Sequence, residues 1–187
     1  ADTPASHTDA SSNTSVGAEA LARDLGFENS AFGYRSMENN FFGFKNSAFG
    51  SRSMENNDFG FDNSAFGRGS LRYNIDGIQN SAFGSQSMEN NDFGSGNSAF
   101  GAGSLYDNES GGYNSALGDG SLAANKSGHR NTAIGARADV SSDVLNNATA
   151  IGAFAIVDAS NKVRIGNTDV SVIEGQVAFT SSSDIRL

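Results

Sequence analysis

A five-residue segment recurs every 17 residues along most of this 187-residue chain. The first copy, at 29–33, reads Asn-Ser-Ala-Phe-Gly. Further copies begin at Asn46, Asn63, Asn80, Asn97 and Asn114, and altered copies begin at Asn131 and Ala148. Eight copies without an insertion indicate one structural unit that is stacked on itself. We call residues that stand 17 positions apart a column, and each column is named after its first residue.

A unit of 17 residues provides only a few short strands with turns, so it cannot enclose a core alone. Stacked as parallel coils about 4.8 Å apart, such units place each column above itself as a ladder. A helical interpretation fails, because apolar residues do not keep helical spacing and Gly and Asn recur too often. The sequence therefore predicts an all-β fold, a parallel β-solenoid with 17-residue coils.

Two columns of large apolar residues are predicted to form ladders in the core. Each side chain contributes about 1.5–3 kcal/mol when it is fully buried. The Phe32 column consists of Phe32, Phe49, Phe66, Phe83, Phe100, Leu117, Ile134 and Ile151. The Met37 column consists of Met37, Met54, Leu71, Met88, Leu105 and Leu122.

Glycine and asparagine columns indicate the turns. The Gly33 column is predicted to form turns where the backbone needs a positive φ or has no room for Cβ. It consists of Gly33, Gly50, Gly67, Gly84, Gly101, Gly118, Gly135 and Gly152. The Gly43 column marks another turn. The columns of Asn29 and Asn40 suit either left-handed corners or ladders of stacked amides.

The repeat divides the chain into three predicted segments. Residues 1–28 are a polar N-terminal segment with a degenerate capping coil, because the 17-residue pattern already begins at Gly26. Residues 29–152 are the repeat β-solenoid. Residues 153–187 are predicted to close the solenoid and to form a shortened junction to a further domain.

Composition excludes several classes of partner. Twelve Lys and Arg against 21 Asp and Glu give a net charge of −9, which repels nucleic acid phosphates and anionic lipids. The chain has no cysteine for disulfides or thiolate metal sites. It also lacks the roughly 20 consecutive apolar residues that a membrane helix needs. We therefore expect no nucleic acid partner and no membrane insertion.

The sequence offers no constellation typical of catalysis. His7 and His129 have no partner at a spacing known from metal sites or catalytic triads, so we interpret both as solvated loop residues. Enzymes built on β-helices usually have longer, irregular coils that form a cleft, whereas these coils are uniform. We predict no enzyme activity, no catalytic residues, no metal site and no cofactor.

Stacked carboxylates are the strongest candidate for an ion site. The three glutamates Glu38, Glu55 and Glu89 share one column. The glycine-rich repeat of calcium-binding β-rolls is missing, however, and arginines stand close enough in sequence to offset the charge. These arginines are Arg35, Arg52 and Arg72. A solvated charged edge is therefore the favoured interpretation.

The later repeats resemble a known family. Residues 131–138 read Asn-Thr-Ala-Ile-Gly-Ala-Arg-Ala, and 148–155 repeat the pattern. This resembles the head repeats of YadA-type trimeric autotransporter adhesins, whose motif is close to A-I-G-x-x-A/S. The resemblance implies a left-handed parallel β-roll in which three chains share one core. The family's usual repeat is shorter, and the step of 14 residues from Ile151 to Ile165 matches it.

The last five residues carry a second resemblance. Residues 183–187 read Ser-Asp-Ile-Arg-Leu, which is similar to the opening of the intramolecular chaperone domain of phage tailspikes and related fibres, S-D-x-R-x-K. In that family the serine and the lysine release the chaperone from the trimer. Ser183 matches the serine, and the lysine position follows Leu187. We expect a longer precursor and no self-cleavage by this chain.

These observations predict an extracellular fibre shaft or adhesin head, on a cell surface or a virion tail fibre, that attaches by multivalent display. The expected partners are two further copies of the chain and a host-surface glycan or protein receptor. The alternative is a single-chain β-solenoid that binds glycans or ice as a flat plate. Only Thr132 and Thr149 follow one another in their column, which argues against ice.

Overall fold

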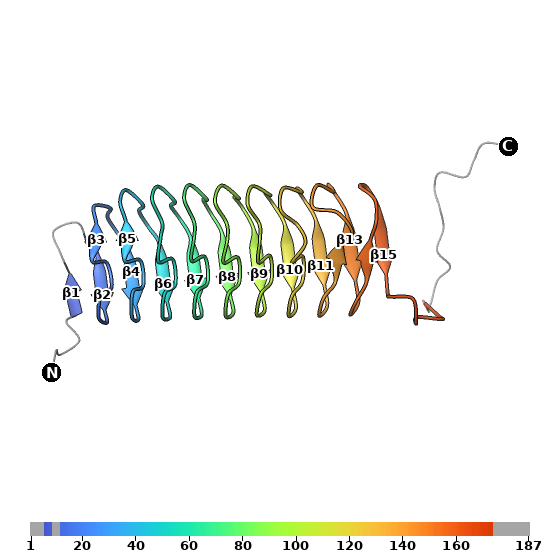
Figure 1. The fold of residues 1–187 in the computed structure, drawn as a ribbon, viewed down its shortest axis with the longest axis horizontal. Helices are drawn as coiled ribbons and strands as arrows, with labels where there is room; N and C mark the ends of the chain where they lie inside the picture. The colour runs from blue at the N-terminus through green and yellow to red at the C-terminus, as the bar shows by residue number, and fades with distance from the viewer. Residues whose placement is uncertain (1–5, 9–11, 174–187) are drawn as a thin grey trace.

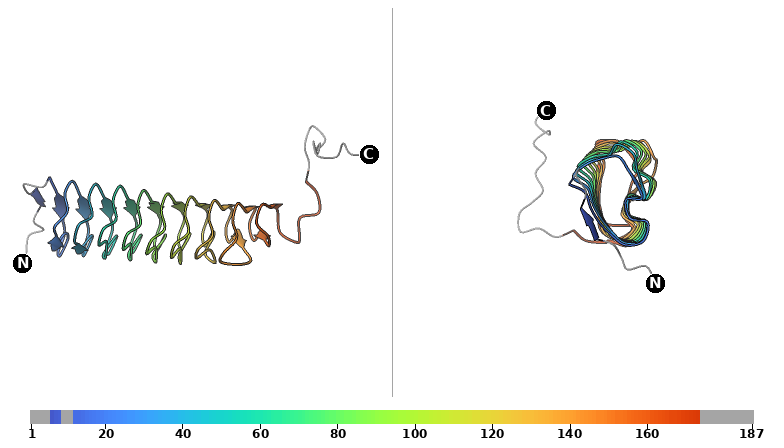
Figure 2. Two further views of the ribbon diagram at one scale, coloured as in Figure 1. Left: turned by 90° about the horizontal axis from the view of Figure 1, so that it is seen from above. Right: turned by 90° about the vertical axis from the view of Figure 1, so that its left-hand side faces the viewer.

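The chain folds into an elongated parallel β-solenoid of about nine coils (Figure 1). The computed structural model describes residues 6–8 and 12–173. These residues contain no helix, and so none that is long and apolar enough to cross a membrane. Seen along the axis, the coils superimpose into one closed outline (Figure 2). The predicted all-β solenoid is therefore confirmed.

One side of every coil contributes a strand to a sheet of 11 strands. In order of pairing, its members are β1 (Ser6–Thr8), β2 (Thr14–Val16), β4 (Ser30–Phe32), β6 (Ser47–Phe49), β7 (Ser64–Phe66), β8 (Ser81–Phe83), β9 (Ser98–Phe100), β10 (Ser115–Leu117), β11 (Thr132–Ile134), β13 (Thr149–Ile151) and β15 (Val163–Ile165). Strand β1 is antiparallel to β2, and the later pairs are parallel. Two short parallel pairs complete the strands: β3 (Arg23–Asp24) with β5 (Asn39–Asn40), and β12 (Asp139–Val140) with β14 (Ile156–Val157).

Pairing keeps each column in register along the sheet. Phe32 pairs with Phe49, and the same relation continues from coil to coil as far as Ile151. The sequence separation between paired residues differs from 17 only at the two ends of the sheet. Val16 pairs with Phe32 in a coil one residue shorter, and Ile165 pairs with Ile151 in a coil three residues shorter. The large sheet thus extends beyond both boundaries of the 29–152 segment.

The interior is narrow and contains two apolar columns. The Met37 column was predicted to lie there, and all six of its residues have 0% exposure. An alanine column, which the sequence analysis missed, forms the same hydrophobic cluster. It consists of Ala31, Ala48, Ala65, Ala82, Ala99, Ala116, Ala133 and Ala150. After Leu122 the core moves one position along the coil, to Val140 and Val157.

The Phe32 column does not lie in the interior, so its assignment as a core ladder within the coil was wrong. Phe100, Leu117 and Ile134 are exposed, by 43%, 54% and 43%. The other five members, Phe32, Phe49, Phe66, Phe83 and Ile151, are half-buried. The physical reason is strand alternation: successive side chains point to opposite faces. Because the alanine column fills the interior, its neighbours on each strand must point outward.

The two glycine columns form turns for different reasons. Residues of the Gly33 column have positive φ, for example 137° at Gly50, a conformation that suits glycine. Glycines of the Gly43 column are not in that region, but they have no space for a side chain. A Cβ atom on Gly43 would lie 2.6 Å from the carbonyl oxygen of Gly60. The Gly33 column also lacks this space, since a Cβ atom on Gly50 would lie 2.5 Å from the carbonyl oxygen of Gly67. Both predicted roles of glycine therefore occur, together in the Gly33 column and without the positive φ in the Gly43 column.

Asparagine amides occupy the space beside the second glycine column. Asn46 accepts a hydrogen bond at Oδ1 from the backbone N–H of Asn63, at 3.0 Å, and donates from Nδ2 to Gly60 O at 2.8 Å. Asn57 donates to the same carbonyl at 2.9 Å and to Asn40 Oδ1 at 2.7 Å. Both asparagine columns are therefore buried amide ladders, and they share the glycine carbonyl as acceptor.

The amide ladders leave no buried polar side-chain atom of the described residues without a hydrogen-bond partner. This matters because an unpaired buried polar group is costly. The interior can therefore be half polar and still stable. The predicted chaperone junction at Ser183 lies outside the described residues.

Removal of one amide should interrupt a ladder. In Asn74→Ala, Asn57 Oδ1 loses its donor and Asn91 Nδ2 loses an acceptor, and each stranded group costs about 1–3 kcal/mol. We expect a clearly lower midpoint of urea unfolding, followed by circular dichroism. The control Ser81→Ala, on the outer face of β8, should stay within about 0.5 kcal/mol of the parent. Equal midpoints for the two variants would contradict the role of the ladder.

Asp139 occupies the Met37 column where the core moves away from it. Burial raises the pKa of its carboxyl, although hydrogen bonds from the N–H groups of Val140 and Ala124 lower that pKa in part. Between the pKa of Asp in the unfolded chain, about 3.9, and the raised pKa of Asp139 in the folded protein, the folded state binds more protons than the unfolded state. The stability contributed by protonated Asp139 is therefore lost as the pH rises through this range.

Asp139→Asn should consequently raise the unfolding midpoint at neutral pH, because it removes the disfavoured charge and keeps a carbonyl acceptor. The advantage should vanish below a pH of about 3.9, where the carboxyl is protonated in both states. Thermal unfolding of both proteins across this pH range measures the difference. An advantage that does not depend on pH would rule out the charge as its cause.

Candidate functional site

An unbroken apolar strip runs along the outer face of the large sheet. We define this outer strip as the eight residues of the Phe32 column. Neighbouring rings stack almost parallel, with centroids 4.7 Å apart and an interplanar angle of 4° between Phe32 and Phe49. The stacking continues to Phe100. A column of Ser and Thr, from Ser30 to Thr149, points to the same face. The outer strip therefore carries no charge.

The outer strip is hollowed where the aromatic residues give way to aliphatic ones. A shallow depression of about 270 Å³ lies over Phe100, Leu117 and Ile134, with serine and threonine at its side. It is lined almost wholly by carbon. A continuous apolar surface of this kind on a soluble protein typically marks a contact with another macromolecule. The surface is suited to packing and not to acid–base chemistry.

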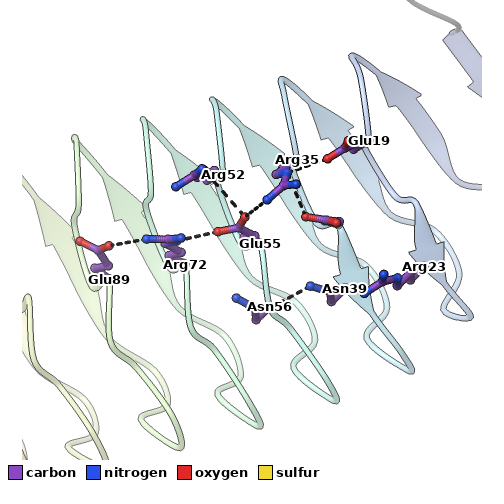
Figure 3. Close-up of polar contacts among 10 residues, drawn as sticks. Glu19, Arg23, Arg35, Asn39, Arg52, Glu55, Asn56, Arg72 and Glu89 are labelled. Atoms are coloured by element: carbon purple, nitrogen blue, oxygen red, sulfur yellow. Dashed lines mark hydrogen bonds and ion pairs between the residues drawn. The ribbon is translucent and has the colours of Figure 1, made fainter.

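A second feature is an ion-pair ladder that crosses several coils (Figure 3). Glu55 is only 5% exposed and accepts a hydrogen bond from Arg72 Nε at 2.6 Å. Arg35 and Arg52 lie 3.7 and 3.8 Å from the same carboxylate. Arg72 also reaches Glu89, at 3.5 Å. The favoured interpretation of these acids as a solvated edge was therefore wrong for Glu55 and Glu89, which are buried and paired.

The charges of the ladder support one another. The hydrogen bond with Glu19 is the main reason why the pKa of Arg35 is raised. Partial burial lowers the pKa of Arg72, but the hydrogen bond and charge of Glu55 outweigh this effect and the pKa is raised. Arg35 and Arg72 also lie over a neighbouring tyrosine ring, at 5.3 Å from the ring centroid of Tyr34 and 4.9 Å from that of Tyr73. The arginines thus neutralise acids that would otherwise repel one another from coil to coil.

Aromatic residues also stack at a corner of the first coils. In the Phe27 column, the rings of Phe27, Phe44 and Phe61 lie 5.0 and 4.7 Å apart. The same column becomes polar further along, where it contains Ser95 and His129. The corner therefore changes character along the axis while the backbone repeats, which makes the two ends of the solenoid chemically different.

The residues considered for chemistry do not come together. His7 lies in β1, and His129 lies at an exposed corner where its Nδ1 accepts a hydrogen bond from Gly112 N–H at 3.0 Å. In the part of the chain that the structure describes, no group of three or more His, Cys, Asp or Glu side chains is placed to hold a metal ion. No protein-family model matches this chain, and no curated protein matches its sequence.

The ion-pair ladder should contribute to stability through Glu55. Glu55→Gln removes a carboxylate that contacts three arginines, so we expect a loss of about 1–2 kcal/mol in the free energy of unfolding. The loss should shrink in high salt, which screens the remaining arginines from one another. The control Glu109→Gln breaks an exposed pair with Lys126 and should change little. Urea unfolding at low and high salt measures both, and equal effects would contradict a special role for Glu55.

Proposed function

We propose that this chain is one subunit of a homotrimeric fibre shaft or adhesin head, which acts outside the cell and attaches by multivalent display. The function is mechanical and adhesive, without enzyme activity. The observation that carries the proposal is the outer strip: eight large apolar residues on the outer face of the sheet, continuous from β4 to β13, of which three are exposed and five are half-buried. A surface of this length invites burial against copies of itself.

Symmetry explains why the strip fits a partner of the same kind. Every coil presents one large apolar residue at the same height, so a second and a third copy offer the same ladder at the same spacing. If three strips meet along a common axis, their exposed apolar area leaves water at once. The resemblance to trimeric adhesin heads supports three copies in preference to two.

The shape of the molecule supports a role in reach and display. The first coil and β15 lie at opposite ends of a straight stack (Figure 1). Hydrogen bonds between every pair of neighbouring coils make such a stack stiff. A shaft that holds three identical surfaces in parallel multiplies weak contacts with a target. Uniform coils also fit display better than catalysis.

A single-chain binding plate remains the alternative function, and the mass of the particle separates the two. Light scattering coupled to size exclusion, at two protein concentrations, should give the mass of three chains of 19.3 kDa at both. A mass of two chains would keep the strip as an interface but overturn the trimer. A single chain at both concentrations would overturn the fibre proposal.

A charge placed on the strip should dissociate the trimer without unfolding the subunit. Phe66 lies in the aromatic part of the strip, stacked between Phe49 and Phe83, and Phe66→Glu should therefore give the mass of one chain with an unchanged circular dichroism spectrum. The matched control is Phe59→Glu, because Phe59 is 53% exposed at another corner of the coil. A trimer that survives the first variant, or is lost in both, would contradict the strip as the interface.

A further inference from the structure

A polar groove lies on the last coils, at the corner where the Phe27 column has changed from aromatic to polar. Its volume is about 520 Å³, and it is lined by Tyr113, His129, Arg130, Asn146, Asn147 and Asn161. These side chains come from four successive coils. They combine an aromatic ring, a cation, an imidazole and three amides, with no carboxylate among them. We call this surface the Tyr113 groove.

Hydrogen bonds hold the polar side chains of the groove in place. His129 Nδ1 accepts from Gly112 N–H at 3.0 Å, so in the neutral ring the proton is carried by Nε2, which is a free donor. The amide of Asn146 accepts at Oδ1 from the backbone N–H of His129 at 2.8 Å. Asn147 donates to Asn161 Oδ1 at 2.9 Å. The groove is therefore organised before any ligand arrives.

Arg130 is the one cation among the residues that line the groove. Among the described residues it forms no ion pair, unlike Arg35, Arg52 and Arg72. An exposed guanidinium offers a planar pair of donors that fits a carboxylate. Tyr113, which is 70% exposed, presents a ring of the kind on which sugar rings stack. A negatively charged sugar would satisfy both residues.

The spacing of the coils fits an extended ligand. Tyr113, Arg130, Asn147 and Asn161 all have φ between 53° and 59°, so they occupy equivalent places in successive coils. Coils separated by about 4.8 Å present one such residue per step, a distance close to the length of one pyranose unit in a polysaccharide. A saccharide chain that lies along the axis would thus meet one residue of the groove with each sugar.

We propose that the Tyr113 groove binds a carboxylated saccharide, with Arg130 on the carboxylate, Tyr113 on a sugar face, and His129 and the asparagines on hydroxyl groups. This proposal rests on the attachment function above and names the class of target that the shaft would recognise. Three identical grooves on one particle would strengthen a weak individual contact.

The rest of the solenoid provides a natural contrast. A second groove of similar size, about 490 Å³, is lined by Tyr73 and by four acids, Asp58, Asp92, Asp107 and Glu109. Burial and then the charge of Glu109 raise the pKa of Asp92, which indicates a negative field in this groove. A carboxylated sugar is repelled there. The same fold therefore predicts selectivity for the groove that holds Arg130.

The test compares two ligands that differ only in the carboxylate. Isothermal titration calorimetry of the full chain is carried out with a β-1,4-linked mannuronic acid tetramer and with the matching neutral mannotetraose. We expect the acidic tetramer to bind more tightly. Arg130→Asn should weaken its binding roughly tenfold or more, because the substitution removes the charge and places at φ 57° the residue type found at Asn147.

Lys45→Asn is the matched control, since Lys45 has the same left-handed conformation, φ 56°, in a coil without the groove. Lys45→Asn should leave the affinity for both tetramers unchanged, whereas Tyr113→Asn should lower the affinity for both. Equal affinity for the two tetramers, no binding of either, or no effect of Arg130→Asn would overturn the proposal. Light scattering of the same samples tests the fibre proposal separately. A monomer that binds the acidic tetramer would support the saccharide site in the Tyr113 groove and overturn the trimer.

Discussion

Two ladders of buried asparagine amides hold the coils in register, and the rest of the structure depends on that register. From Asn29 to Asn114, each amide of the Asn29 column accepts the backbone N–H of the next asparagine and donates to a glycine carbonyl. The Asn40 column donates to the same carbonyl from the other side. These bonds satisfy corner groups that the short strands leave unpaired. A shift of one residue would strand them all, so no other register is competitive.

With the register fixed, each outward column becomes a continuous surface. The Phe32 column forms the outer strip because stacking places its rings 4.7 Å apart. The column of Glu55 places acids above one another, and arginines interleaved with them remove the repulsion. Each outward-facing column of the repeat therefore forms its own strip along the solenoid, and the residue type in that column sets the chemistry of the strip.

The proposed recognition site lies where a column departs from its own pattern. The Phe27 column is aromatic in the first coils and polar around His129. The change of side chain leaves the backbone hydrogen bond at this corner in place: Lys45 N–H donates to Phe27 O in the first coils, and Asn147 N–H donates to His129 O in the last. In the proposed attachment shaft, one face would serve assembly and a short stretch of another face would serve recognition.

The sequence by itself determined the period, the parallel all-β fold, the buried Met37 column and the two uses of glycine, because stacking makes every column visible as an exact repeat. Only the tertiary structure showed that the Phe32 column faces outward and that the alanine column beside it faces inward. Because all columns repeat equally, the repeat does not show which side chains face the interior. The path of the coil around its narrow interior determines that Ala31 points inward and Phe32 outward. The invariant alanine was the available signal, since only a small side chain fits opposite Met37. The ion pairs of Glu55 with arginines and the Tyr113 groove could also be found only from the structure. Both bring together residues from several coils, and the repeat alone does not show the shape of the corners where these residues meet.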